Sequence, residues 1–233
     1  MPVSRATPLL RILALETSTE HCSVALRIGS DIRSSEKQAG HKHSELLLPM
    51  VDDLLQQAGL KLADLDAIAF GAGPGSFTGL RIACGVAQGL AFPVDCRCVP
   101  VGSLEALAEA SGGARVVVCT DARMGQVYHA AFEREGAEWR EVLTPSLCEP
   151  DDLPELPGGN WLGCGSGFDR YPQMMAGRYR TSVKEIRHGV LPHAREIALL
   201  GAQYLATGRS VASTEAAPVY VRNKVALTMK EQK

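Results

Sequence analysis

Between residues 65 and 92, a short apolar segment, a glycine-rich turn and a long apolar segment follow one another. Residues 65–73 have the length of a strand and an almost wholly apolar composition, which is typical of a central strand buried on both faces. Residues 76–92 predict a helix that is apolar around most of its surface, and such a helix needs cover on more than one side. The sequence therefore predicts an α/β fold in which this helix packs on a sheet.

A similar order of elements occurs twice along the chain, with three strands forming an antiparallel meander in each set. The elements of the first set are expected at residues 12–19, 22–29, 31–38, 43–59, 65–73 and 76–92. Those of the second set are expected at residues 103–111, 114–123, 125–135, 138–147, 161–167 and 194–208. We predict two tandem α/β halves, residues 1–100 and 101–233, each with a mixed sheet. The last helix either closes the second half or crosses back to the first.

Composition excludes several classes of protein. The 233 residues are 45% apolar and 21% charged, which is ordinary for a globular protein, and the formal net charge of −2 shows no excess for binding nucleic acid alone. We find no uninterrupted run of about 18 apolar residues and no signal-peptide pattern, so we expect a cytoplasmic protein without a membrane segment. The seven scattered cysteines predict free thiols, mostly small buried side chains.

The glycine-rich turn raises the question of phosphate binding, because such turns often present backbone N–H groups to an anion. A P-loop requires a lysine after its last glycine, and leucine follows Gly79. The dinucleotide fingerprint fails as well, because Thr78 stands at the position of its third glycine. Two interpretations remain. Gly73 and Gly75 form a tight strand-to-helix turn, or an anion binds at Ser76 and Thr78.

A second candidate site lies where the first strand ends. Glu16 stands there, followed by hydroxyl residues in a hairpin, and a carboxylate so placed could hold Mg²⁺ with a phosphate. The alternative is a polar hairpin with a solvated carboxylate. His41 and His43 stand two apart in a loop, and no cysteine or carboxylate set completes a metal site there, so we predict none.

The helices at residues 43–59 and 76–92 carry more apolar residues than one sheet-facing stripe needs. A partner would have to cover the remainder, and a column of small residues in the second helix would let another helix approach closely. We assign the partner contact to Leu47, Met50, Val51, Leu54, Gly79, Ala83 and Ala87. Charged residues at Val51 and Leu54, or at Ala83 and Ala87, would then abolish pairing and spare the fold. The alternative is that the second half of the chain covers both helices.

Five stretches of the chain together resemble the TsaB family, formerly YeaZ, over residues 12–226. They are ILALETSTEHCSVAL, HSELLLPMVDDLLQQAGL, LDAIAFGAGPGSFTGLRIACGVAQGLAF, DARMGQVYHAAF and PVYVRNKVA. GPGSFTGLR is the most specific part, and the second half matches more loosely. The resemblance implies two halves of the actin-like, sugar-kinase-like (ribonuclease H-like) fold.

The resemblance also implies a function. TsaB proteins are non-catalytic subunits of the bacterial complex that forms threonylcarbamoyladenosine on tRNA. They bind and support the TsaD transferase, enable recruitment of the TsaE ATPase, meet tRNA through the complex and form homodimers when alone. TsaD carries an HxxxH metal pair, whereas this chain has HxH. The DxGT phosphate motif of the fold is replaced by residues 16–18, Glu-Thr-Ser, without glycine.

The resemblance therefore predicts no catalytic residue, no metal and no cofactor that this chain requires. ATP with Mg²⁺ would be confined to a vestigial phosphate site at Glu16, Gly73, Gly75, Ser76 and Thr78. One alternative is an ATP-dependent enzyme of the same fold. Another is a glycoprotease-like hydrolase, as the family was once labelled, although no nucleophile motif supports it. Direct tRNA binding would have to use the locally basic residues 177–189.

Overall fold

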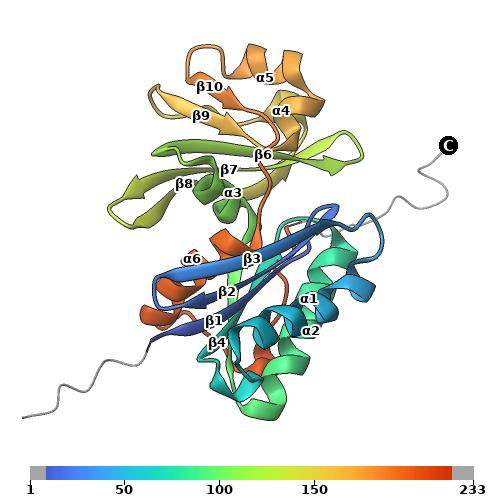
Figure 1. Cartoon of the computed structure of the whole chain (residues 1–233). Coiled ribbons are helices and arrows are strands. Elements are labelled where there is room, and N and C mark those ends of the chain that lie inside the picture. Colours follow the sequence, from blue (N-terminus) through green and yellow to red (C-terminus); the bar gives the residue numbers. More distant parts are fainter. Residues whose placement is uncertain (1–8, 222–233) are drawn as a thin grey trace, which may run out of the picture.

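The computed structural model describes residues 9–221, which form two lobes, each built on a five-stranded sheet (Figure 1). In the first lobe β2 is antiparallel to both of its neighbours, and β4 and β5 run parallel to β1. The strand order is β3-β2-β1-β4-β5. The strands are β1 Arg11–Glu16, β2 His21–Ile28, β3 Asp31–Gln38, β4 Ala67–Gly73 and β5 Arg97–Gly102.

The second lobe repeats this plan. Read from the opposite end, its order β8-β7-β6-β9-β10 has the same two antiparallel pairs followed by two parallel pairs. The strands are β6 Arg115–Arg123, β7 Gln126–Glu135, β8 Glu138–Cys148, β9 Trp161–Cys164 and β10 Val183–Arg187. The prediction of two related halves with mixed sheets is therefore confirmed.

Helices cover both faces of each sheet. On the first sheet, α1 (His43–Ala58) and α2 (Phe77–Ala91) bury one face, and α6 (Ala194–Ala206) buries the other. On the second sheet, α3 (Ser103–Ser111) covers one face, and α4 (Ser166–Arg170) and α5 (Pro172–Arg178) cover the other. The remaining helical segments are short 3-10 turns at Leu62–Asp64, Phe92–Val94, Pro150–Asp152 and Ser213–Glu215.

The last long helix crosses back to the first lobe, as one of the two sequence-based alternatives proposed. It packs against β1, β2 and β4, and Gly201 permits the close approach, because a Cβ there would lie 2.7 Å from the Cβ of Ala69. Residues 101–233 therefore contribute to both lobes. Whether residues 1–100 fold as a separate unit stays a prediction.

Four elements were missing from the sequence-based prediction. We expected a connection at residues 93–102, but these residues contain the β5 strand. The strand expected at residues 161–167 ends at Cys164, and α4 follows it. The α5 helix and β10 lie within a stretch without apolar periodicity. All seven cysteines are free and six are buried, as predicted. The last part of the PVYVRNKVA stretch, residues 222–226, lies outside the described residues.

Among residues 9–221, one helical segment is long and apolar enough to raise the question of a membrane span, and it begins with α2. No uninterrupted apolar run was found in the sequence, yet Phe77–Val94 is long and apolar enough on average to cross a bilayer. In the structure its inner side chains pack on the first sheet, and Ala83 and Ala87 are fully buried. Length and composition alone are weak evidence for a membrane span, because a core helix has the same properties.

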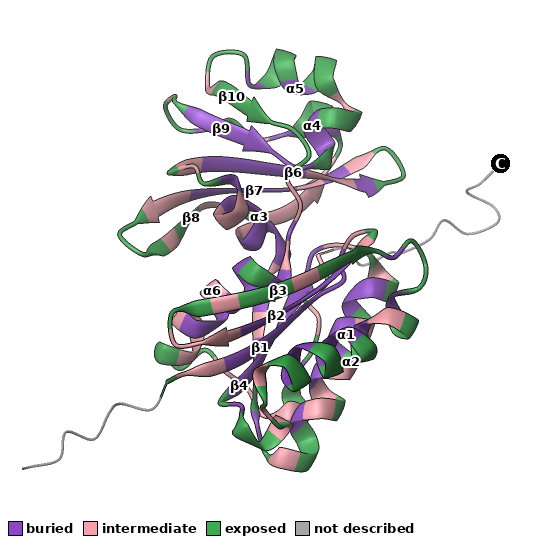
Figure 2. Ribbon diagram, viewed as in Figure 1, coloured by how far each residue is buried: buried purple, intermediate pink, exposed green. Residues whose placement is uncertain are grey.

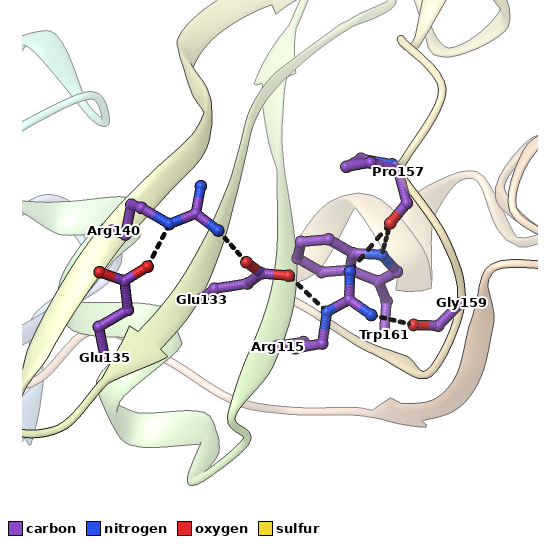
Figure 3. Close-up of polar contacts among 7 residues, drawn as sticks. All are labelled: Arg115, Glu133, Glu135, Arg140, Pro157, Gly159 and Trp161. Atoms are coloured by element: carbon purple, nitrogen blue, oxygen red, sulfur yellow. Dashed lines mark hydrogen bonds and ion pairs between the residues drawn. The ribbon is translucent and has the colours of Figure 1, made fainter.

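A polar network fixes the proline-rich connection between β8 and β9 (Figure 3). The guanidinium of Arg115 lies 4.5 Å from the ring centre of Trp161 and pairs with Glu133 at 2.6 Å. It also donates to the carbonyl oxygens of Gly159 at 2.6 Å and Pro157 at 2.9 Å. Because one planar donor group serves four partners, lysine cannot replace it.

We expect Arg115→Lys to lower the free energy of unfolding by about 2 kcal/mol, because two carbonyls lose charge-assisted bonds and the Trp161 ring loses its stacked partner. Urea denaturation measures the loss. The control is Arg140→Lys in the same network, where Arg140 pairs with Glu133 and Glu135 at the surface. That change should cost under about 0.5 kcal/mol, and equal losses would contradict the assignment.

Candidate functional site

The glycine-rich turn and the β1–β2 hairpin lie against each other. Because β1 and β4 are parallel, their carboxyl ends meet at one edge of the sheet. The backbone N–H of Ser76 donates to the carbonyl oxygen of Ser18 at 2.8 Å, and the Thr17 hydroxyl donates to the carbonyl of Gly79 at 2.8 Å. The structure thus brings the two candidate phosphate segments together.

The glycines of this turn make room for the hairpin. A Cβ at Gly79 would lie 1.9 Å from the Thr17 carbonyl oxygen, and one at Gly75 would lie 2.6 Å from the Ser18 Cβ. Gly73 has a φ of 109°, which L side chains rarely adopt. The glycines therefore let the hairpin backbone lie directly against the turn.

The start of α2 is capped by its own chain. The Ser76 hydroxyl accepts a hydrogen bond from the backbone N–H of Gly79 at 3.3 Å, as an N-cap residue does. Thr78 is exposed on the first turn of the helix. Whether an anion binds at Ser76 and Thr78 stays a prediction.

Glu16 is buried, so the expectation of a solvated carboxylate is wrong. Its side chain accepts hydrogen bonds from the backbone N–H of Ser18 and, at 3.3 Å, from the Ser103 hydroxyl. Gly71 leaves the space for it, because a Cβ there would lie 2.0 Å from Oε2. Burial raises the pKa of Glu16, and the hydrogen bonds from Ser18 and Ser103 oppose that effect in part.

This raised pKa has a defined consequence for stability. As the pH rises above 4.5, the unfolded chain loses its Glu16 proton before the folded chain does, so the contribution of Glu16 to stability falls. Above the folded-state pKa the penalty is complete. We expect Glu16→Gln to raise the free energy of unfolding by about 1 kcal/mol or more at pH 8, and the gain should shrink toward pH 4.5.

Urea denaturation between pH 4.5 and 8 tests this expectation. The control is Glu20→Gln, an exposed carboxylate in the same hairpin, for which no gain is expected. A gain from Glu16→Gln that does not change with pH would show that the ionised carboxylate carries no penalty.

The structure corrects our assignment of the partner contact. Its proposed side chains form the core between the helices and the sheet: Leu47, Met50, Val51, Leu54, Ala83 and Ala87 are each at most 4% exposed. Gly79 lies under the hairpin. In the folded lobe these groups expose almost no surface to a partner, and charged substitutions there are expected to disrupt the fold. The assignment failed because these helices have apolar residues on several sides, so the sequence does not indicate which side faces the sheet.

The outward side of α2 is largely apolar, whereas the exposed residues of α1 are mostly polar apart from Leu48 and Pro49. Figure 2 shows that the outward sides of both helices are exposed or partly exposed. Leu48 is 48% exposed and Phe92 is 68% exposed, and both are large apolar side chains. Three further apolar residues of α2 are half-buried at four-residue spacing: Ile82, Val86 and Leu90. We call the exposed sides of α1 and α2, together with Phe92, the outward helix face.

A shallow groove lies along α2, between that helix and residues 213–214. It has a volume of about 420 Å³ and is lined by Gly85, Gln88, Gly89, Phe92, Ser213 and Thr214. A Cβ at Gly85 or Gly89 would meet no atom within 4 Å, so the absent side chains leave open space.

The second lobe does not cover these helices, so that alternative is wrong for most of the face (Figure 1). Within the described part of the second half, the segment after α6 crosses α2, where Gln88 donates to the carbonyl of Ala216 at 2.9 Å. Further on, Arg81 donates to the Tyr220 hydroxyl at 2.9 Å, and its guanidinium lies 3.8 Å from the ring centre of Phe77. The segment that contains Tyr220 covers the end of the glycine-rich turn. In the sequence it was noticed only as part of the PVYVRNKVA stretch that resembles the TsaB family.

The histidines do not form a metal site in the part of the chain that the structure describes, where no group of three or more metal-binding side chains occurs. His43 is buried and its Nε2 lies 2.9 Å from the carbonyl oxygen of Thr19, to which it donates. His41 is exposed in the preceding loop. The HxH pair is thus split between the interior and the surface.

One pair resembles a hydrolase dyad. The Ser146 hydroxyl lies 2.8 Å from Nε2 of His129. His129 is only 4% exposed, burial lowers its pKa, and its Nδ1 has no hydrogen-bond partner among the described residues. A catalytic base needs a third group that orients it and access to substrate, so this pair does not support the hydrolase alternative.

The basic stretch at residues 177–189 is partly used inside the second lobe. Arg178 donates to the carbonyl of Leu153, and Arg187 donates to the carbonyl of Ser111. Side chains that satisfy buried carbonyls are less available to phosphates. The geometry therefore gives no independent support to direct tRNA binding.

Comparison with known proteins gives a consistent result. A family model described as TsaD, tRNA N6-adenosine threonylcarbamoyltransferase, matches residues 30–228. The tRNA threonylcarbamoyladenosine biosynthesis protein TsaB of Escherichia coli is 37% identical over 93% of this chain and 96% of its own. The TsaB of Haemophilus influenzae is 36% identical over 93% and 95%.

Solved structures agree with these relatives. YeaZ from Pseudomonas aeruginosa is 37% identical and superposes with a TM-score of 0.83 over 91% of this chain and 100% of its own. A second structure has a TM-score of 0.84, 37% identity and coverage of 92% and 100%, and is described as an uncharacterized protein with similarity to the peptidase YeaZ.

Proposed function

The chain belongs to the TsaB family, and from that premise we propose that it is a non-catalytic subunit of the machinery that forms threonylcarbamoyladenosine on tRNA. It binds and supports a TsaD-like transferase through the outward helix face and enables a TsaE-like ATPase to join the complex. tRNA is met through the assembled complex. The relatives named for this modification are bacterial, and we place the chain in the cytoplasm.

The exposed apolar side chains on α2 and at Leu48 of α1 are the observation that carries the proposal. Leu48 projects from α1, and Phe92 lines a groove on α2 that is open because two glycines line it. An apolar surface of this kind on a lobe that already has a complete core marks a site of protein contact. When the transferase is absent, a second copy of the chain would use the same face.

The contacts around the glycine-rich turn favour a supporting role over catalysis. The hairpin packs directly against this turn, Glu16 is buried against Ser103, and residues 216–221 lie over the end of the turn. We therefore propose that the chain requires no cofactor. Isothermal titration of the isolated chain with Mg-ATP should show no binding in the micromolar range, and turnover would support the ATP-dependent alternative.

Binding to the transferase is tested with two surface variants, Leu48→Glu and Phe92→Glu. Each places a charge on the outward helix face, so we expect affinity for the TsaD-like partner to fall at least tenfold in sedimentation experiments. Met174→Glu is the control, because Met174 is 42% exposed on the second lobe. Unchanged affinity in both surface variants, with native circular dichroism, would place the contact elsewhere.

A further inference from the structure

The helix α3 lies between the two lobes, on the side of the second sheet that faces the first lobe (Figure 1). Its side chains divide between two hydrophobic cores. Leu104 and Leu107 pack in the core of the second lobe with side chains of β6, β7 and β9. Ala106, which is fully buried, belongs to the core of the first lobe with side chains of β1, β4 and α6. The cores of the two lobes therefore meet at one helix.

A hydrogen bond joins α3 to α6 beside this apolar contact. The Tyr204 hydroxyl of α6 donates to a carboxylate oxygen of Glu105 on α3, and the guanidinium of Arg209 lies 3.4 Å from the ring centre of Tyr204. Burial raises the pKa of Glu105, and the hydrogen bond from Tyr204 and the charge of Arg209 oppose that effect. Because the carboxylate loses hydration where the lobes meet, it depends on this donor.

Two further contacts cross between the lobes. The Ser103 hydroxyl, at the start of α3, donates to the buried carboxylate of Glu16 in β1 at 3.3 Å. Trp139 of β8 packs against the cores of both lobes, and its indole N–H donates to Glu109 of α3 at 2.8 Å. Contacts at several separate points restrict rotation of one lobe against the other as well as their separation.

We infer that α3 is an interlobe latch, which holds the two lobes in one fixed orientation, and that the hydrogen bond between Tyr204 and Glu105 is the contact on which the latch depends. Domains of one chain commonly move relative to each other unless a large hydrophobic interface joins them. Here the apolar contact at Ala106 is continuous with the core of the first lobe. The strand β5 also leads into α3 without a linker, because Ser103 directly follows Gly102. The inference concerns this chain alone and does not rest on the proposed function.

The orientation of the lobes can be measured as the distance between two nitroxide spin labels. Asp53→Cys on α1 and Gln173→Cys on α5 place one label at an exposed helical position of each lobe, away from α3. Cys148→Ser removes the native thiol that is half-buried, and the other six are buried. With no further substitution in the full-length chain, we expect double electron–electron resonance to give a single narrow distance distribution.

Glu105→Lys should release the latch. The new ammonium group would lie near Arg209 and could not accept the hydrogen bond from Tyr204, so we expect the width of the distance distribution to rise about twofold or more. Tyr204→Phe removes the donor and leaves the carboxylate unpaired, and it should broaden the distribution as well. The matched control is Glu185→Lys, which reverses the charge of a carboxylate that pairs with Arg187 at 2.8 Å within the second lobe. It should leave the distribution unchanged.

Circular dichroism establishes that each labelled variant is folded before the distances are compared. If Glu105→Lys does not fold, Tyr204→Phe alone decides the result. A wild-type distribution that is broad or has more than one peak would show that the lobes move against each other, and would overturn the inference. So would a distribution that stays as narrow as wild type in every folded latch variant, because the latch would then not depend on this bond.

Discussion

Gly79→Ala is expected to lower the free energy of unfolding by about 3 kcal/mol or more. The added Cβ would lie 1.9 Å from the carbonyl oxygen of Thr17, and non-bonded contacts of that length do not occur. The obstacle is backbone, so the β1–β2 hairpin has to move away. That movement strains the hydrogen bonds from Thr17 to Gly79 and from Ser76 to Ser18.

The control is the same substitution two turns later. A Cβ at Gly85 meets no atom within 4 Å, so Gly85→Ala should raise stability by up to about 1 kcal/mol through helix propensity. Thermal and urea denaturation of the two variants should therefore shift in opposite directions. If Gly79→Ala is as stable as wild type, the hairpin does not rest on the turn.

Val51→Glu is expected to cost about 4 kcal/mol or more, enough to leave much of the first lobe unfolded at room temperature. Val51 is 3% exposed and packs between α1 and the sheet. A carboxylate at this position would lose its hydration without gaining a partner. Circular dichroism and urea denaturation measure the loss.

Leu48→Glu on the same helix is the matched control for stability. Leu48 is 48% exposed, so its replacement should change the free energy of unfolding by no more than about 0.5 kcal/mol. A folded Val51→Glu variant that has lost its partner would restore our original assignment of the contact.

The sequence predicts the two-sheet plan well because strand and helix periodicities are local signals. The apolar run of β4 and the meanders of both halves need no knowledge of distant residues. The β5 strand was missed because Pro100 interrupts its short apolar run, although proline is tolerated in β5, which lies at the edge of the sheet. The α4 helix was missed because it begins within a glycine- and serine-rich stretch.

The site was harder to predict because its decisive contacts are long-range. Glu16 is buried through Gly71 and Ser103, which are 55 and 87 residues away in the chain. No local pattern around Glu16 indicates either contact. The side of α1 that faces the sheet depends on how the helix is rotated about its axis. The sequence does not reveal this rotation, because the adjacent residues Leu47 and Leu48 are equally apolar.

The return of α6 to the first lobe sets an order of events during synthesis. Until α6 leaves the ribosome, the face of the first sheet that carries Ile12, Ala14 and Ala69 has no cover from it. About 90 residues separate the end of β5 from the start of α6, which is roughly 5 to 18 seconds of translation. During that interval the nascent first lobe lacks the cover that α6 gives to this apolar face of the sheet.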